Sequence, residues 1–192
     1  MTPATGPVTT VIFAGRPLPE SVPLGTREDV GWAFAYTDEQ RRSLIEEIKT
    51  ELTGDGRQEC AIYSWDRPCR STMEYTRDEL TGGNVWMNIG VAEFPPQGLT
   101  AVTEYGHGAL VFHVEHEGGS RLFFGVNHDP FPSPPVIRYD TGGDSLFPRR
   151  SVFSLGRLHA AVEEYILTGQ RPTNVGWTEN RRSDLPRLDP RW

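Results

Sequence analysis

The sequence predicts an α+β fold in which a mainly antiparallel β-sheet carries two principal helices on one face. Two segments repeat apolar residues at helical spacing, and shorter runs rich in β-branched and aromatic residues lie between them. The 192 residues, 36% of them hydrophobic, suffice for one buried core. We therefore expect a single domain over residues 1–178 and a flexible polar tail over residues 179–192.

The first thirty residues are rich in Pro, Gly and Thr and predict loops, apart from an edge strand over residues 8–13. The first helix is expected after Thr37, because Thr37 and Gln40 have the spacing of a capping box. Gly54 is expected to end it. The apolar residues that recur at helical spacing are Leu44, Ile45, Ile48 and Leu52.

Five strands are expected between the two helices, because each run is bounded by Gly, Pro or Asn. They cover residues 59–65, 84–91, 99–104, 108–115 and 121–126. The glycine-containing link at residues 116–120 predicts a hairpin between the last two. Alternation predicts a core face with Leu110, Phe112, Val114, Leu122, Phe124 and Val126. The other face is expected to carry Val111, His113, Glu115 and Arg121.

The second helix is expected over residues 152–168, capped by Ser151 and ended by Gly169. Its apolar stripe consists of Leu155, Leu158, Val162, Tyr165 and Ile166. Four prolines between residues 127 and 135 exclude a regular strand there. A closing strand is expected at residues 175–177.

The net charge of −7 opposes direct nucleic-acid binding, because phosphate contacts need a basic surface. Residues 71–137 alone contain eight carboxylates and two arginines, a concentration that would attract a basic partner. No apolar run approaches the ~20 residues of a membrane-spanning helix, and the first residues lack a secretory pattern. Cys60 and Cys69 are too few for a disulfide framework, so we expect a cytoplasmic protein.

Motifs for enzyme chemistry are missing from the sequence. It contains no phosphate-binding glycine loop, no nucleophile elbow and no zinc-binding pattern. We therefore expect no catalysis, no cofactor and no metal. The best metal candidate gathers three histidines and two carboxylates, namely His113, Glu115, His116, His128 and Asp129. A metal-dependent hydrolase built on His113, Glu115, His128 and Asp129 is a weaker alternative. Strand alternation separates His113 from the neighbouring His116, which favours an ordinary polar sheet face.

Acidic and aromatic residues are interleaved between residues 73 and 88, and aromatic anchors inside a charged rim are typical of tight interfaces. Trp86 is equally compatible with the core. The residues expected to contact a partner are Glu74, Tyr75, Asp78, Glu79, Trp86, Asn88, Glu104, Glu115 and Asp129.

From Gly108 onward the chain resembles immunity protein family one, small bacterial proteins found beside polymorphic toxins. The resemblance is carried by the hairpin start at residues 108–112, the Pro-rich loop, and residues 162–172 followed by Val175 and Trp177. The motif positions Gly108, Gly169, Arg171, Pro172 and Trp177 are expected to be structural.

The resemblance implies an α+β fold without catalysis and a cognate toxin domain as partner, bound by a monomer in a 1:1 complex. Because family members often accompany nucleic-acid deaminase toxins, it further implies a deaminase whose active site or substrate groove is occluded. The acidic surface would enter that groove. A binding module with a non-toxin partner is the alternative.

Overall fold

The computed structural model describes residues 8–14, 30–35, 37–54, 56–65, 97–116, 119–139 and 143–188. Four of the five strands expected between the helices are confirmed, and the one expected at residues 84–91 lies outside the described residues. The elements are β1 (Val8–Ala14), β2 (Val30–Ala35), α1 (Asp38–Leu52), β3 (Gln58–Trp65), β4 (Gln97–Glu104), β5 (His107–His116), β6 (Gly119–Val126), η2 (Arg149–Ser151), β7 (Phe153–Ser154), α4 (Leu155–Thr168), β8 (Gly176–Asn180) and η3 (Arg182–Asp184).

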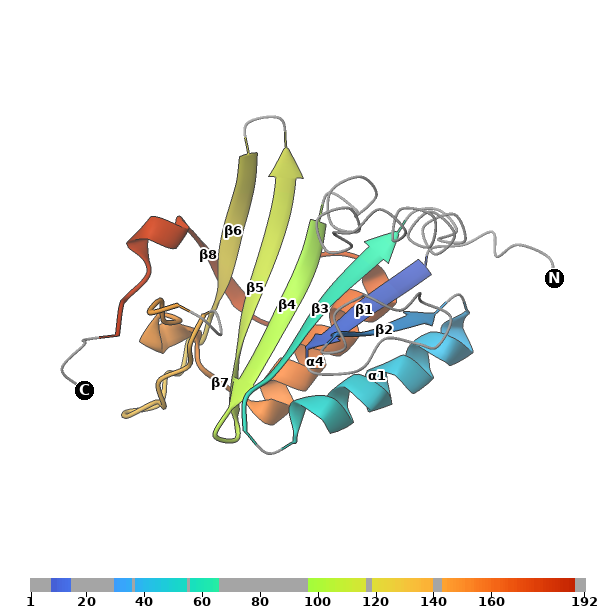
Figure 1. Cartoon of the computed structure of the whole chain (residues 1–192), viewed down its shortest axis with the longest axis horizontal. Helices are drawn as coiled ribbons and strands as arrows, with labels where there is room; N and C mark the ends of the chain where they lie inside the picture. The colour runs from blue at the N-terminus through green and yellow to red at the C-terminus, as the bar shows by residue number, and fades with distance from the viewer. Residues whose placement is uncertain are drawn as a thin grey trace.

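The strands form an antiparallel sheet, as expected, in the order β2-β1-β3-β4-β5-β6-β8, with β7 beside β5 (Figure 1). β1 pairs with β2 on one side and β3 on the other, so the expected edge strand lies inside the sheet. The loop is expected to continue to Gly31, but β2 already begins at Val30 and forms the edge of the sheet. Local composition does not reveal which strands pair.

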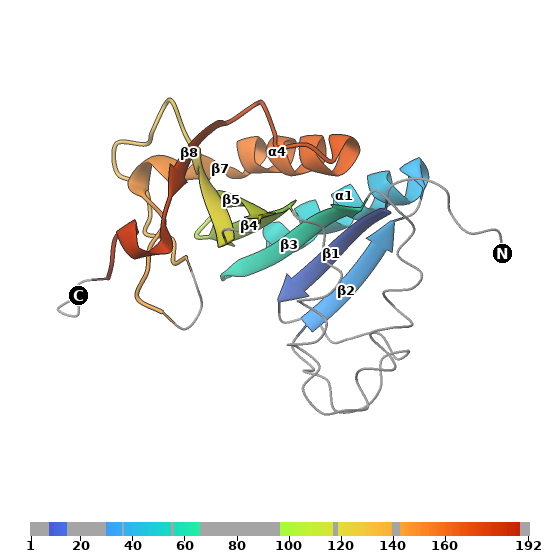
Figure 2. The same cartoon turned by 90° about the horizontal axis from the view of Figure 1, so that it is seen from above.

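Both helices pack on the same face of this sheet, as expected (Figure 2). At the start of α1, the Thr37 Oγ1 accepts a hydrogen bond from the Gln40 N–H at 3.2 Å, and the Gln40 Oε1 accepts one from the Thr37 N–H at 3.1 Å. This confirms the capping box. The core between helices and sheet includes Leu44, Ile48, Ile62, Leu99, Leu110, Phe112, Leu158, Val162, Tyr165 and Ile166.

The second helix begins at Leu155 rather than residue 152, and Ser154 replaces Ser151 as its N-cap residue. The three residues up to Ser151 form a 3-10 turn, and Phe153 and Ser154 pair with the start of β5 as β7. Helical periodicity alone predicts that these two residues belong to the helix, but they pair with β5 as a strand instead. Gly169 ends the helix as expected, with φ of 66°.

The β5–β6 hairpin buries apolar side chains on both faces. Phe112 lies opposite Phe123, and Val111 lies opposite Phe124. Directly opposite residues share a face of an antiparallel sheet. The expectation that Leu122, Phe124 and Val126 join the face of Leu110 and Phe112 is therefore wrong, as is the placement of Arg121 beside Val111. The closing pair, His116 with Gly119, leaves a two-residue loop and sets this register.

The face away from the helices carries a second core. It comprises Val102, Ala109, Val111, Phe124, Ile137, Phe147, Val152 and Leu185. Residues 137–139, 143–147 and 185–188, here called the cap layer, cover it. Backbone hydrogen bonds hold the cap layer together, including Tyr139 N–H to Ser145 O at 2.8 Å and Leu146 N–H to Pro186 O at 2.7 Å.

The expected tail after residue 178 differs from the structure. β8 continues to Asn180, and Leu185 is 95% buried in the second core, so the described residues 179–188 pack on the sheet. Residues 189–192 lie outside the described part. Polar composition concealed this packing, because a single leucine among arginines and prolines gives no periodic pattern.

The turn between β4 and β5 contains a strained residue. Tyr105 and Gly106 both have positive φ, 54° and 72°, as in a type I′ turn, and Tyr105 is 72% exposed. Asparagine tolerates this conformation better than tyrosine does. We expect Tyr105→Asn to raise the free energy of unfolding by about 1 kcal/mol in chemical denaturation. Tyr105→Phe is the control and should leave it unchanged; a less stable Asn variant would contradict the account.

Candidate binding surfaces

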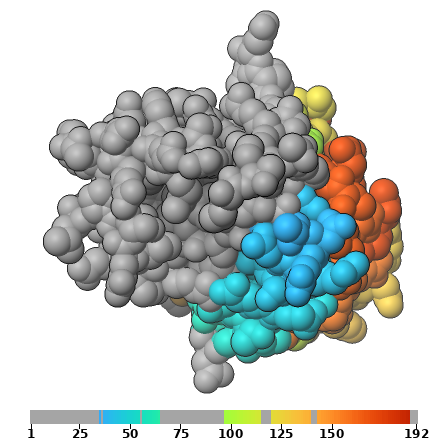
Figure 3. Space-filling model, turned by 90° about the vertical axis from the view of Figure 1, so that its right-hand side faces the viewer, coloured from blue at the N-terminus to red at the C-terminus, as the bar shows by residue number. Residues whose placement is uncertain are grey.

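The outer surface formed by α1 and α4 is acidic. Together the two helices carry seven carboxylates and four Lys or Arg residues. Figure 3 shows α1 and α4 side by side on one surface of the molecule. Lys49 joins them, because its Nζ lies 3.0 Å from the Glu46 carboxylate and 2.9 Å from that of Glu163. The hydrogen bonds that Lys49 donates to Glu163 and Glu46 raise the pKa of Lys49, and burial opposes them.

His159 on α4 lies beside this ion-paired group. Its Nε2 is buried and has no hydrogen-bond partner among the residues that the structure describes. Burial lowers the pKa of His159 below its ordinary value of 6.5, and the positive charge of Lys49 lowers it further, while Glu46 opposes both. The folded protein therefore favours the neutral imidazole.

A second surface begins where α4 ends. The Gly169 N–H donates to the Tyr165 carbonyl at 2.8 Å, and the Gly169 carbonyl accepts from the Gln97 Nε2 at 3.0 Å. The Glu164 carboxylate then accepts from the Thr173 N–H and hydroxyl, each at 2.7 Å. Partial burial alone would raise the pKa of Glu164, but these hydrogen bonds lower it overall. The turn between α4 and β8 is thus fixed at both ends.

Trp177 secures the turn to the sheet. Its Nε1 donates to the Pro172 carbonyl at 2.7 Å, and its ring meets Phe112 edge to face at 6.1 Å between centroids. Pro172 itself is buried. The structural roles expected for Pro172 and Trp177 therefore have a geometric basis. Gly108 has one too, because a Cβ there would lie 2.8 Å from the Leu158 side chain.

Arg171 lies in this turn and stacks on the rings below it. Its Cζ is 4.6 Å from the centroid of Phe123 and 5.9 Å from that of Phe112. Arg121 also lies over Phe123, at 5.1 Å, and makes a bidentate ion pair with Glu179, with Nε 2.9 Å from Oε1. We call this surface the arginine ledge, formed by Arg121, Phe123, Arg171, Trp177 and Glu179.

The ledge has the chemistry of a binding surface. Arg171 is exposed and forms no ion pair with any residue that the structure describes. A guanidinium presents a planar fork of donors that fits a carboxylate. The sequence assigned Arg171 only a structural role, because the register that places Phe123 beneath it is set by the hairpin rather than by residues near Arg171.

Most of the residues expected to contact a partner fall outside the described part of the chain, namely Glu74, Tyr75, Asp78, Glu79, Trp86 and Asn88. Glu104 is only 6% exposed, so it adds little to an acidic surface. Glu115 pairs with Ser120 near the end of β5, whereas Glu104 pairs with His107 at its start, about 26 Å away along the strand. Asp129 is exposed, and its N–H donates to the Asn127 Oδ1 at 3.1 Å.

The residues of the hypothetical metal site are spread along the hairpin. His113 lies opposite Leu122 and meets Tyr63 edge to face, at 5.6 Å between centroids. Val126 is four residues beyond Leu122, about 13 Å along β6, and His128 follows it. Among the described residues, no group of three or more His, Cys, Asp or Glu could hold a metal ion. No helix in the described ranges is both long and apolar enough to span a membrane.

Comparison with known proteins gives a family match. The family model described as Immunity protein Imm1 matches residues 20–179. This range includes both helices and every residue of the arginine ledge. No curated protein matches the chain at a significant level.

Gly169 should be hard to replace. A Cβ there would lie 2.8 Å from the Ser64 Oγ, on a residue whose φ is 66°. We expect Gly169→Ala to lower the free energy of unfolding by about 1–2 kcal/mol. Gly156→Ala is the matched control on the same helix, since a Cβ at Gly156 meets no atom within 4 Å, and it should be neutral or stabilising. Equal effects of the two changes would count against this assignment.

The depressed pKa of His159 predicts a pH dependence. Below pH 6.5 the unfolded chain binds a proton at His159 more readily than the folded chain does, so stability is complete above that pH and declines as the pH falls. We expect the wild type to lose more stability than His159→Gln between pH 7.5 and 5.5, measured by denaturant titration. The pKa of Glu164 is lowered from 4.5, so its protonation changes stability only below pH 4.5, outside this pH range. Identical pH profiles would refute the prediction.

Proposed function

Because the chain belongs to the Imm1 family of immunity proteins, we propose that it neutralises a nucleic-acid deaminase toxin by occluding the active site or substrate groove with an acidic surface. Proteins of this family are non-enzymatic toxin inhibitors, so the chain binds a cognate toxin and turns over no substrate of its own. In this proposal a cytoplasmic monomer binds one toxin domain.

The concentration of negative charge carries the proposal. Residues 71–137 hold eight carboxylates against two arginines, in a chain whose net charge is −7. A toxin that grips nucleic acid needs a basic groove for the phosphates. An acidic surface can occupy such a groove, and its long-range field would raise the association rate.

The helices supply a second source of negative charge. Asp38, Glu39, Glu46 and Glu47 are exposed on α1, and Glu163 and Glu164 are half-buried on the adjacent α4. Lys49 compensates only part of this charge, because it serves both Glu46 and Glu163. The acidic field in the proposal therefore does not depend on residues 71–96 alone.

Charge reversal tests this function. The double variant Asp78→Lys with Glu79→Lys should slow association with the toxin domain about tenfold or more at low ionic strength, and the difference should shrink in high salt. Association rates and residual deaminase activity are the measurements. We expect the gene adjacent to this one to encode the toxin domain, which supplies the partner for the test.

The control changes charge equally at another surface. Asp144 and Asp184 are exposed residues in or beside the cap layer, so Asp144→Lys with Asp184→Lys should alter the association rate much less. If both double variants associate like the wild type, or both slow equally, the acidic segment does not enter the groove. A toxin domain with no activity on nucleic acids would overturn the deaminase assignment.

A further inference from the structure

We propose that the arginine ledge is a contact surface for the toxin domain, and that Arg171 is its anchor and binds a toxin carboxylate. This inference rests on the proposed function for the identity of the partner. It adds a contact of opposite charge to the acidic surface considered above.

First, among the described residues, the charge of Arg171 is not compensated by a carboxylate. Its neighbour Arg121 already uses both oxygens of Glu179, and both guanidinium groups lie over the Phe123 ring. In the part of the chain that the structure describes, no carboxylate pairs with Arg171. None of the described carboxylates satisfies its N–H donors, and in this proposal a carboxylate of the toxin domain does so.

The second argument is that Arg171 is held in place before binding. The guanidinium lies over the Phe123 and Phe112 rings, and the turn on either side is held by Gly169 and by the Trp177–Pro172 hydrogen bond. A long side chain normally loses conformational entropy when an interface orders it. Much of that loss is already incurred here during folding, which suits Arg171 to anchor a tight complex.

The third argument is the composition of the surface around it. Phe123 and Trp177 are partly buried aromatic residues, while Arg121 and Glu179 each leave about half of their side chain exposed. Aromatic and arginine anchors inside a polar rim are typical of interface hot spots. At the upper end of the sheet in Figure 1, β5 extends two residues past its pairing with β4.

The sign of the charge decides the class of ligand. A nucleic-acid backbone is disfavoured, because the chain as a whole is strongly negative and a single exposed arginine cannot offset that repulsion. One carboxylate on a folded partner requires only one guanidinium fork, with two parallel hydrogen bonds. The ledge therefore fits an acidic side chain that projects from the toxin domain.

The test compares the full chain with three variants against the toxin domain. Arg171→Gln should raise the Kd about 30-fold or more, mainly through faster dissociation. Arg171→Lys keeps the charge but loses the fork, so it should fall between Arg171→Gln and the wild type. Arg149→Gln is the control, since Arg149 is exposed and has no ion pair among the described residues, and it should bind like the wild type.

A charge swap separates contact from folding. Arg171→Glu should abolish tight binding, and replacing one toxin carboxylate with Lys should restore at least part of the affinity, an outcome that a purely structural role for Arg171 would not produce. Thermal unfolding of each variant shows whether the fold is retained.

The inference alone is overturned if Arg171→Gln binds and inhibits like the wild type, or if Arg171→Gln and Arg149→Gln weaken binding equally. A failure of every carboxylate substitution in the toxin to rescue Arg171→Glu would do the same. If the wild-type chain neither binds the toxin domain nor inhibits it, the proposed function itself fails.

Discussion

The pairing of Phe112 with Phe123 across β5 and β6 is the constraint on which the rest of the structure depends. It places one row of apolar side chains beneath the helices and the neighbouring row, with Val111 and Phe124, beneath the cap layer. A shift of one residue would turn every side chain of β6 to the other face. Phe123 would then no longer lie beneath Arg171, and Phe124 would no longer pack in the second core.

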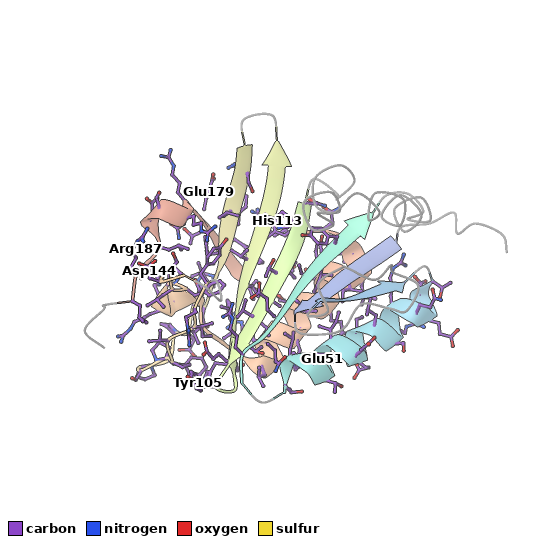
Figure 4. The ribbon with its side chains drawn as sticks, in the orientation of Figure 1. Glu51, Tyr105, His113, Asp144, Glu179 and Arg187 are labelled. Carbon is purple, nitrogen blue, oxygen red and sulfur yellow. The ribbon has the colours of Figure 1, made fainter. Side chains whose placement is uncertain are left out.

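The charges follow the same division into layers. The helix layer has seven carboxylates and four Lys or Arg residues, whereas residues 137–150 and 181–188 contain six arginines and three aspartates. Figure 4 shows Asp144 beside Arg187, which pair at 3.0 Å on the cap-layer side, while Tyr105 lies at the lower end of the sheet. A partner with a basic groove is therefore attracted to the helix side and repelled from the cap layer.

The sequence predicted the features that depend on local chemistry. The capping box at Thr37, the helix end at Gly169 and the central strands were all readable from spacing and composition. The faces of β6, the start of α4 at Leu155 and the packing of Leu185 were not, because each is determined by partners distant in the chain. Arg171 as a candidate contact was missed for the same reason: its environment is Phe123, 48 residues earlier.

Amide hydrogen exchange of the chain, alone and bound to the toxin domain, tests most directly the claim that it acts by covering its partner with these surfaces. The account predicts slower exchange on binding at residues 169–180, at the end of the β5–β6 hairpin and in residues 71–88, with little change in the cap layer. Protection confined to the cap layer would contradict it.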